Sequence, residues 1–222
     1  MLVPSFVLRQ ITTITRRLIE LSMCIDQTFP KMSVSQGNFT NIGFPGDEHL
    51  VSTLKDRAYK DIYDDLNDNR AYNIRMLDGA MLQMTYRFKR DKIEKHRLAF
   101  LPSPYLEDFQ NYPEIYENDE IYADIIMKDI VVFPIRFDFD NCPGISTPLK
   151  HPKSHLTLGN YKNCRIPVTA PLTPHVFVDF ILRNFYNTAH GNYEKCFTPD
   201  SGAFENTIDV IENTVICINI PC

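Results

Sequence analysis

The sequence predicts an α+β fold with a largely antiparallel sheet of about six strands, helices on one face, and an N-terminal helical docking element. Two observations support this prediction. Apolar residues first recur at helical spacing and then, from about position 72, at every second position. Helices, strands, a helix and a final strand also follow one another, instead of alternating regularly. The chain of 222 residues, 44% hydrophobic and 23% charged, has the composition of a folded globular protein.

The first predicted element is an amphipathic helix at the N-terminus. Its apolar stripe has spacings of three and four residues, close to a heptad pattern. We expect this helix to dock on its own domain; a dimer or partner-protein interface is the alternative. We divide the chain into an N-terminal helix and loop, 1–46, and a single α+β domain, 47–222. The stripe consists of Val7, Ile11, Ile14, Leu18, Leu21 and Ile25.

A predicted loop and a second helix follow. Residues 30–46 are rich in Pro, Gly, Ser and Asn, which predicts a loop. Asp47 is a suitable N-cap for the second helix, which ends near the polar stretch NDNR at 67–70. The apolar face of this helix would contain Leu50, Leu54, Ala58, Ile62 and Leu66.

The middle of the chain predicts antiparallel strands. Asp78-Gly79 lies between two alternating runs and is a favoured pair for a primed hairpin turn. The run 96–104 predicts a further strand that ends at prolines, and the acidic, tyrosine-rich segment 103–124 predicts a solvated surface. Further strands are expected at 131–140, 154–159 and 164–168, then a helix capped by Thr173 with Pro174 at its first position, and a late strand in NTVICINIP.

Charge and cysteine content restrict the functional classes. The net charge of −5 excludes a globally basic surface, so any nucleic-acid contact requires a local patch. The 6 cysteines are scattered without a CxxC pair, as in reducing compartments. The N-terminus lacks the features of a signal peptide, and no apolar run is long enough to span a membrane. We therefore expect a cytoplasmic protein without a membrane interaction.

Polar residues gather on one face of the predicted sheet. Side chains alternate across a strand, so Ile135, Phe137 and Phe139 should point into the core and the residues between them outward. The same reasoning applies to the neighbouring strands. The outward face then collects Arg87, Arg136, Asp138, Asp140, His155, Thr157 and Arg165.

These side chain types suit phosphate chemistry. The Cα atoms of Asp138 and Asp140 would be roughly 7 Å apart, so their carboxylates are candidate ligands for Mg²⁺ or Mn²⁺. Arg87, Arg136, Arg165 and Thr157 are candidate ligand-binding residues, because the planar guanidinium group fits phosphate oxygens. His155 could transfer a proton near neutral pH, so it joins the two aspartates as a candidate catalytic residue. The alternative is that Asp138 and Asp140 form cross-strand ion pairs with Arg136 and Arg165.

The segment that contains Asp138, Asp140 and His155 resembles two known families. The run HPKSHLTLGNYKNCRIPV…FVDFILRNFY, 151–186, resembles the signature of an uncharacterised bacterial family, a domain of unknown function. That resemblance implies no established activity; similar proteins suggest a bacterial accessory or antiviral defence system. IRFDFD and KSH are also similar to motifs of archaeo-eukaryotic primase-polymerases. This implies metal ligation by Asp138 and Asp140, nucleotide binding by His155, and a third carboxylate at Asp179, although Asp179 lies in a predicted helix.

Other motifs give weaker indications. HLTL at 155–158 is similar to the H-x-T-x element of two-histidine phosphoesterases, but the second copy is missing. Cys142, His151, His155 and Cys164 are of types that bind zinc, without the usual closely spaced cysteine pair. We expect a nucleotide- or nucleic-acid-acting protein with metal-dependent phosphoryl chemistry. The alternative is a non-catalytic subunit that binds a partner protein, or a second copy, through the 7–25 stripe and the 103–124 segment.

Overall fold

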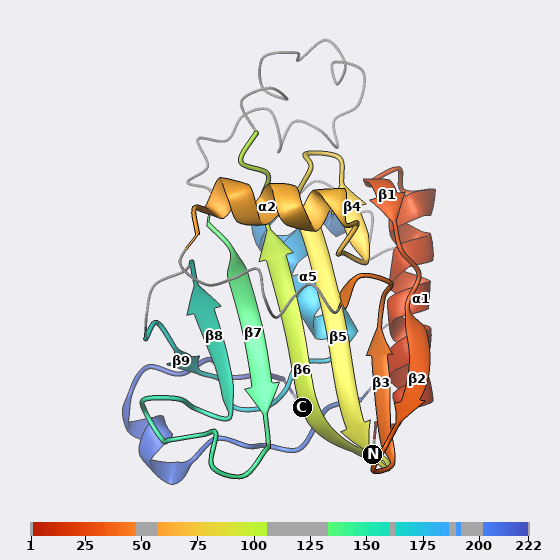
Figure 1. Ribbon diagram of the computed structural model, residues 1–222. Coiled ribbons are helices and arrows are strands. Elements are labelled where there is room, and N and C mark those ends of the chain that lie inside the picture. The colour runs from red at the N-terminus through yellow and green to blue at the C-terminus, as the bar shows by residue number, and fades with distance from the viewer. Residues whose placement is uncertain are drawn as a thin grey trace.

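The computed structural model describes residues 2–47, 57–105, 133–159, 163–186, 190–191 and 202–221. The described chain is an α+β fold built on a 9-stranded, largely antiparallel sheet (Figure 1). The helices are α1 (Pro4–Glu20), α2 (Tyr59–Asp68), α5 (Pro174–Phe185) and the 3₁₀ helix η4 (Val210–Thr214). The strands are β1 (Cys24–Gln27), β2 (Lys31–Ser35), β3 (Phe39–Gly43), β4 (Ile74–Met76), β5 (Met81–Lys89), β6 (Lys92–Leu101), β7 (Ile135–Asp140), β8 (Ser154–Leu158) and β9 (Ile166–Pro167).

The strands follow the order β1-β4-β5-β6-β7-β8-β9, with β3 pairing β5 and β2 pairing β3. Every ladder between named strands is antiparallel. The β2–β3 hairpin corrects the prediction of a loop over 30–46. Its turn uses Gly37 and Asn38, both with positive φ, and such turn-forming residues produced the loop-like composition.

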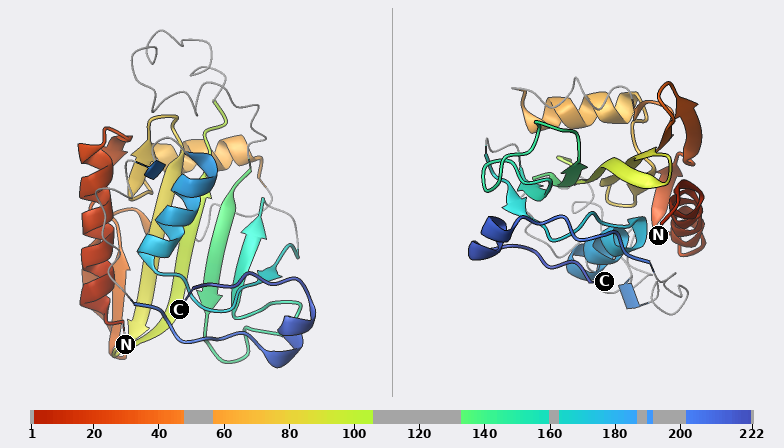
Figure 2. Two further views of the ribbon diagram at one scale, coloured as in Figure 1. Left: turned by 180° about the vertical axis from the view of Figure 1, so that it is seen from behind. Right: turned by 90° about the horizontal axis from the view of Figure 1, so that it is seen from below.

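The back face of the sheet carries the main hydrophobic core. Alternate side chains of β5, β6 and β7 point to this face, where α1, α5 and the C-terminal segment cover them (Figure 2). The α1 stripe is buried in this core: Val7, Ile11 and Leu18 are all 0% exposed. The stripe therefore docks on its own domain and is not available to a partner. Ile25 leaves the helix and is an exposed residue of β1.

The helix α2 lies on the other face of the sheet, the front face in Figure 1. It packs Ile62 and Leu66 against Met81, Ala99 and Leu101, which alternate with the back-face residues of their strands. The prediction of helices on one face thus describes α1 and α5 but not α2. The structure begins this helix at Tyr59, with Ala58 as N-cap; Leu50 and Leu54 lie outside the described residues, as does most of the 103–124 segment.

Two local predictions are confirmed in their main features. The Thr173 hydroxyl accepts a hydrogen bond from the backbone N–H of Val176 and caps α5. Asp78 and Gly79 form the β4–β5 turn, but only Gly79 of the two has positive φ, so the turn is not of the expected primed type. The Asp78 carboxylate is buried and accepts a hydrogen bond of 2.7 Å from the Tyr186 hydroxyl, which ties the turn to α5.

The C-terminal segment differs from its prediction. Instead of a late strand it forms η4, whose start is fixed by a capping box between Asp209 and Glu212. Val168 and Ile218 form an isolated parallel bridge, and further hydrogen bonds join the segment to Ser154 and Thr169. Among the described residues, no helix has the length and apolarity needed to cross a membrane.

A buried histidine links the sheet to the segment before α5. His96 is 1% exposed, lies between the rings of Tyr86 and Phe139, and accepts a hydrogen bond from the backbone N–H of Leu172 through Nε2. Burial lowers the pKa of His96 to about 4, below its ordinary value of 6.5. His96 is therefore neutral at pH 7.

This pKa predicts a pH-dependent stability. The unfolded chain binds the His96 proton more tightly than the folded one, so the stabilising contribution is complete above pH 6.5 and decreases as the pH falls toward 4. The loss in unfolding free energy should be on the order of 3 kcal/mol. Urea unfolding at pH 7 and pH 4 measures it, with His96→Gln as control, because glutamine can still accept from Leu172. Equal pH dependence in both proteins would contradict this account.

Candidate functional site

The predicted polar face exists as the part of the front face below α2. On β7, Arg136, Asp138 and Asp140 alternate with three buried apolar residues. On β8, His155 and Thr157 lie on the same face, since His155 is the register partner of Asp138 and Thr157 that of Arg136. The structure thus brings the expected side chains of β7 and β8 together.

Two cations on β6 that were not expected from the sequence also lie on this face. In the β6–β7 register, Arg97 lies opposite Asp138 and Lys95 opposite Asp140. Lys95 and Arg97 alternate with the buried His96 and Leu98, so they lie on the front face. This becomes clear once the strand is known to begin at Lys92. The strand was expected to begin only at 96, so this alternation was incomplete.

Both aspartates form cross-strand ion pairs with these cations. The Arg97 Nε donates to Asp138 Oδ1 over 3.2 Å, and the Lys95 Nζ donates to Asp140 Oδ2 over 2.9 Å. Ion pairing was the expected alternative, but with Arg136 and Arg165 as partners. Burial raises the pKa of Asp138, yet the charges of Arg97 and Arg136 outweigh it and hold the pKa below its ordinary value. Both carboxylates are ionised at neutral pH, because the pKa of Asp140 is lowered too.

Arg136 carries an unsatisfied donor on this face. Its Nε is buried without a hydrogen-bond partner among the described residues. Burial lowers its pKa, and so do the charges of Arg97 and Arg165, while Asp138 opposes them. Arginine stays charged even so. A buried donor without a partner is costly, which makes this guanidinium a candidate for binding an anionic ligand.

His155 and its neighbours are less accessible than an open face implies. His155 and Thr157 are each 5% exposed. The His155 Nδ1 lies 2.9 Å from the carbonyl oxygen of Pro152, and because a carbonyl only accepts, Nδ1 carries the proton. Burial lowers the pKa of His155, against the opposing charge of Asp138. The ring is therefore neutral at pH 7, with Nε2 as its acceptor. Arg165 donates to the carbonyl of Lys150.

Cations crowd the front face on the other side of β6. Arg87 on β5 is the register partner of Lys95, and like charges directly opposite each other destabilise a sheet. The Arg87 Cζ lies 3.9 Å from the centre of the Phe39 ring, so a cation–π contact holds it against β3. A chain of net charge −5 thus carries Arg87, Lys95, Arg97 and Arg136 together on one face. This arrangement can bind anions.

The described residues bring together neither the zinc set nor the set of three carboxylates considered from sequence. Among the described residues, no group of three or more His, Cys, Asp or Glu side chains could hold a metal ion. This covers Cys142, His151, His155 and Cys164, whose two cysteines are free thiols. The third carboxylate implied by the primase-polymerase resemblance is also misplaced: Asp179 lies on α5, behind the sheet, and pairs with Arg183 and His190.

The family model of an uncharacterised conserved protein family, DUF2290, matches residues 23–220. The chain belongs to this family, as the signature at 151–186 indicated. No curated protein and no solved structure is significantly similar to it.

The ion pair on β6 and β7 predicts a change in pKa. Arg97→Gln removes the largest favourable charge near Asp138, so the pKa of that carboxyl should rise. Carbon-detected NMR titration of the aspartate side chains measures it. Arg87→Gln is the matched control, because Arg87 is not among the charges that hold the Asp138 pKa down. An unchanged Asp138 pKa in Arg97→Gln would contradict the ion pair.

Proposed function

We propose that the protein binds a phosphate-bearing ligand, a nucleotide or a nucleic acid, on the front face of its sheet. The observation that carries the proposal is the crowding of cations on this face. Arg87 lies opposite Lys95, and Arg136 is close enough to Arg97 and Arg165 for each to lower its pKa. Such repulsion is relieved when an anion binds between the cations.

The side chain chemistry favours phosphate over other anions. Guanidinium groups offer a planar set of donors that matches phosphate oxygens. Arg136 has an unpartnered buried Nε, and Thr157 lies in register beside it. Asp138 and Asp140 act in this proposal as counter-ions, which hold Arg97 and Lys95 in place while the face has no ligand.

Metal-dependent phosphoryl chemistry is a more specific form of the same proposal. Asp138 and Asp140 would then ligate Mg²⁺ or Mn²⁺ instead of pairing with Arg97 and Lys95, and His155 would accept a proton through Nε2. The two forms make opposite predictions. If the aspartates are counter-ions, Asp138→Asn should strengthen phosphate binding, since it removes a negative charge; if they are metal ligands, it should abolish metal-dependent binding.

A second candidate function is a non-catalytic subunit that binds a protein partner. The α1 stripe is buried and cannot serve this role. A different apolar surface favours it: Val210, the first residue of η4, and Ile216, two residues beyond the end of η4, are 85% and 88% exposed, with Ile211 and Val215 between them. Neighbouring exposed apolar side chains are typical of contact surfaces. If wild type binds no phosphate-bearing probe, that result would favour this second candidate over the first.

The primary test is a binding titration without metal at low salt. Fluorescent ATP and a labelled single-stranded oligonucleotide are titrated with wild type, Arg136→Gln and Arg16→Gln. The Arg136 variant should bind at least one probe about ten-fold more weakly, as expected for loss of a charged hydrogen bond. Arg16→Gln, the same change on an exposed position of α1, should bind as wild type does.

Added salt should weaken wild-type binding, because the contacts are electrostatic. Repeating the titration with Mn²⁺ and with Asp138→Asn separates the two forms of the proposal. Absence of binding to both probes, or equal affinities of the two arginine variants, would contradict the proposed function.

A further inference from the structure

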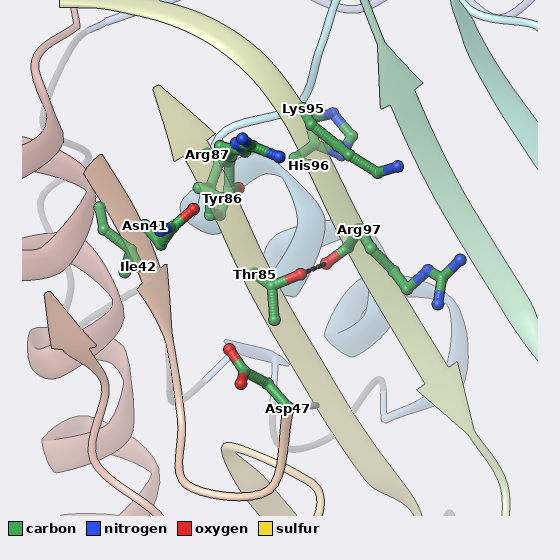
Figure 3. A pocket seen from close by; sticks show the side chains of 9 residues that line it. All are labelled: Asn41, Ile42, Asp47, Thr85, Tyr86, Arg87, Lys95, His96 and Arg97. Atoms are coloured by element: carbon green, nitrogen blue, oxygen red, sulfur yellow. Dashed lines mark hydrogen bonds between the residues drawn. The ribbon is translucent and has the colours of Figure 1, made fainter. Parts of the chain in front are cut away.

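A pocket of about 270 Å³ opens on the front face between β3, β5 and β6 (Figure 3). It lies beside the predicted site residues of β7 and β8. Most of its lining surface is apolar, with charged side chains at its edges. The cations come from β5 and β6, and a carboxylate comes from the turn that follows β3. The lining includes Asn41, Asp47, Thr85, Arg87, Lys95 and Arg97.

The cations of this pocket are held in fixed positions. Arg87 rests on the Phe39 ring, Lys95 is bonded to Asp140, and Arg97 is bonded to Asp138. Arg87 and Lys95 nevertheless stand directly opposite each other across β5 and β6. Because Arg87 and Lys95 are already held in place beside the pocket, they form a preorganised binding site for a single phosphate group.

A carboxylate occupies another part of the pocket. Asp47 lies across from Arg87 and Lys95 in Figure 3, with Thr85 between them. Asp47 packs so closely on Gly43 that a larger residue at 43 would collide with its carboxylate. The carboxylate has lone pairs for several donors, and it would repel a second phosphate. It can accept hydrogen bonds from the hydroxyl groups of a sugar.

The surroundings limit the length of the ligand. Asp138 and Asp140 stand on the β7 side of Lys95 and Arg97, and Asp47 lies in the pocket itself. A strand of nucleic acid, which carries a charge at every residue, would meet these carboxylates beyond the first phosphate. The volume also lies just below the usual range for ligand pockets, which favours a small ligand.

We propose that this pocket binds one small phosphorylated sugar, such as a nucleoside 5′-monophosphate. The phosphate lies between Arg87 and Lys95, and the sugar hydroxyls face Asp47. This inference rests on the proposed function and deepens it, because it selects a single nucleotide over a nucleic-acid strand.

The test is isothermal titration calorimetry with AMP, inorganic phosphate and a twelve-residue oligothymidylate. Wild type, Arg87→Gln, Asp47→Asn, Arg136→Gln and the α1 control Arg16→Gln are compared, each first checked for unchanged thermal unfolding. Wild type should bind one AMP per chain. Arg87→Gln should weaken both AMP and phosphate at least ten-fold, whereas Arg87→Lys, which keeps the charge without the planar donors, should weaken them less.

Asp47→Asn separates the sugar from the phosphate. It should weaken AMP binding several-fold but leave inorganic phosphate as tight as before or tighter, because a negative charge is removed. If inorganic phosphate binds as well as AMP in wild type, the sugar has no role and the inference is overturned. Tighter binding of the oligothymidylate than of AMP would overturn it in favour of a strand.

The remaining outcomes distinguish this inference from the proposed function. If Arg136→Gln weakens a probe while Arg87→Gln and Asp47→Asn do not, the face binds phosphate but this pocket is not the place, and the inference fails alone. If no phosphate-bearing probe binds to wild type, both fail. Should Asp47→Asn alter the unfolding temperature, Arg87→Gln and Arg87→Lys still decide the phosphate position.

Discussion

The alternation of side chains along β5, β6 and β7 is the constraint on which the rest of the structure depends. Every second residue of these strands packs into the core beneath α1 and α5, so the residues between them must lie on the front face. A shift of one residue in register would exchange the two sets, burying the charges and exposing the aromatic rings. Burial of one face therefore fixes which polar groups meet on the other.

Register then determines which charges become neighbours. It places Arg97 opposite Asp138 and Lys95 opposite Asp140, which forms two ion pairs, but it also places Arg87 opposite Lys95. The half-buried Arg136 lacks a partner for its Nε among the described residues. The partly exposed Lys95–Asp140 pair contributes little to stability, and the fold alone does not explain why Arg87 lies opposite Lys95. The proposed anionic ligand would explain this arrangement, and the two aspartates would then adjust the affinity of the face for it.

The sequence predicted what depends on periodicity and local chemistry. Strands such as β7, whose apolar and polar residues alternate strictly, and the Thr173 cap of α5 were found correctly. The β2–β3 hairpin was missed because Gly37, Asn38 and the neighbouring serines have the composition of a loop. The prediction of a late strand was wrong because alternation around Ile216 and Ile218 says nothing about a pairing partner.

The shared face of Asp138 and His155 could be predicted because side chains alternate along each strand. Which residues lie beside them depends on the cross-strand register, which only the structure gives. The pocket brings together Asp47 and Arg87, which are 40 positions apart in the chain, so local sequence patterns could not predict it.

The central claim is that the front face holds a phosphate between Arg87 and Lys95. Two-dimensional ¹H–¹⁵N NMR of the protein, titrated with AMP, tests it most directly. The account predicts saturable shifts that are largest for the amides of Asn41, Thr85 and Lys95 and for the Arg87 side-chain Nε–H, with the η4 segment unchanged. Shifts confined to residues 210–216, or none at saturating AMP, would contradict it.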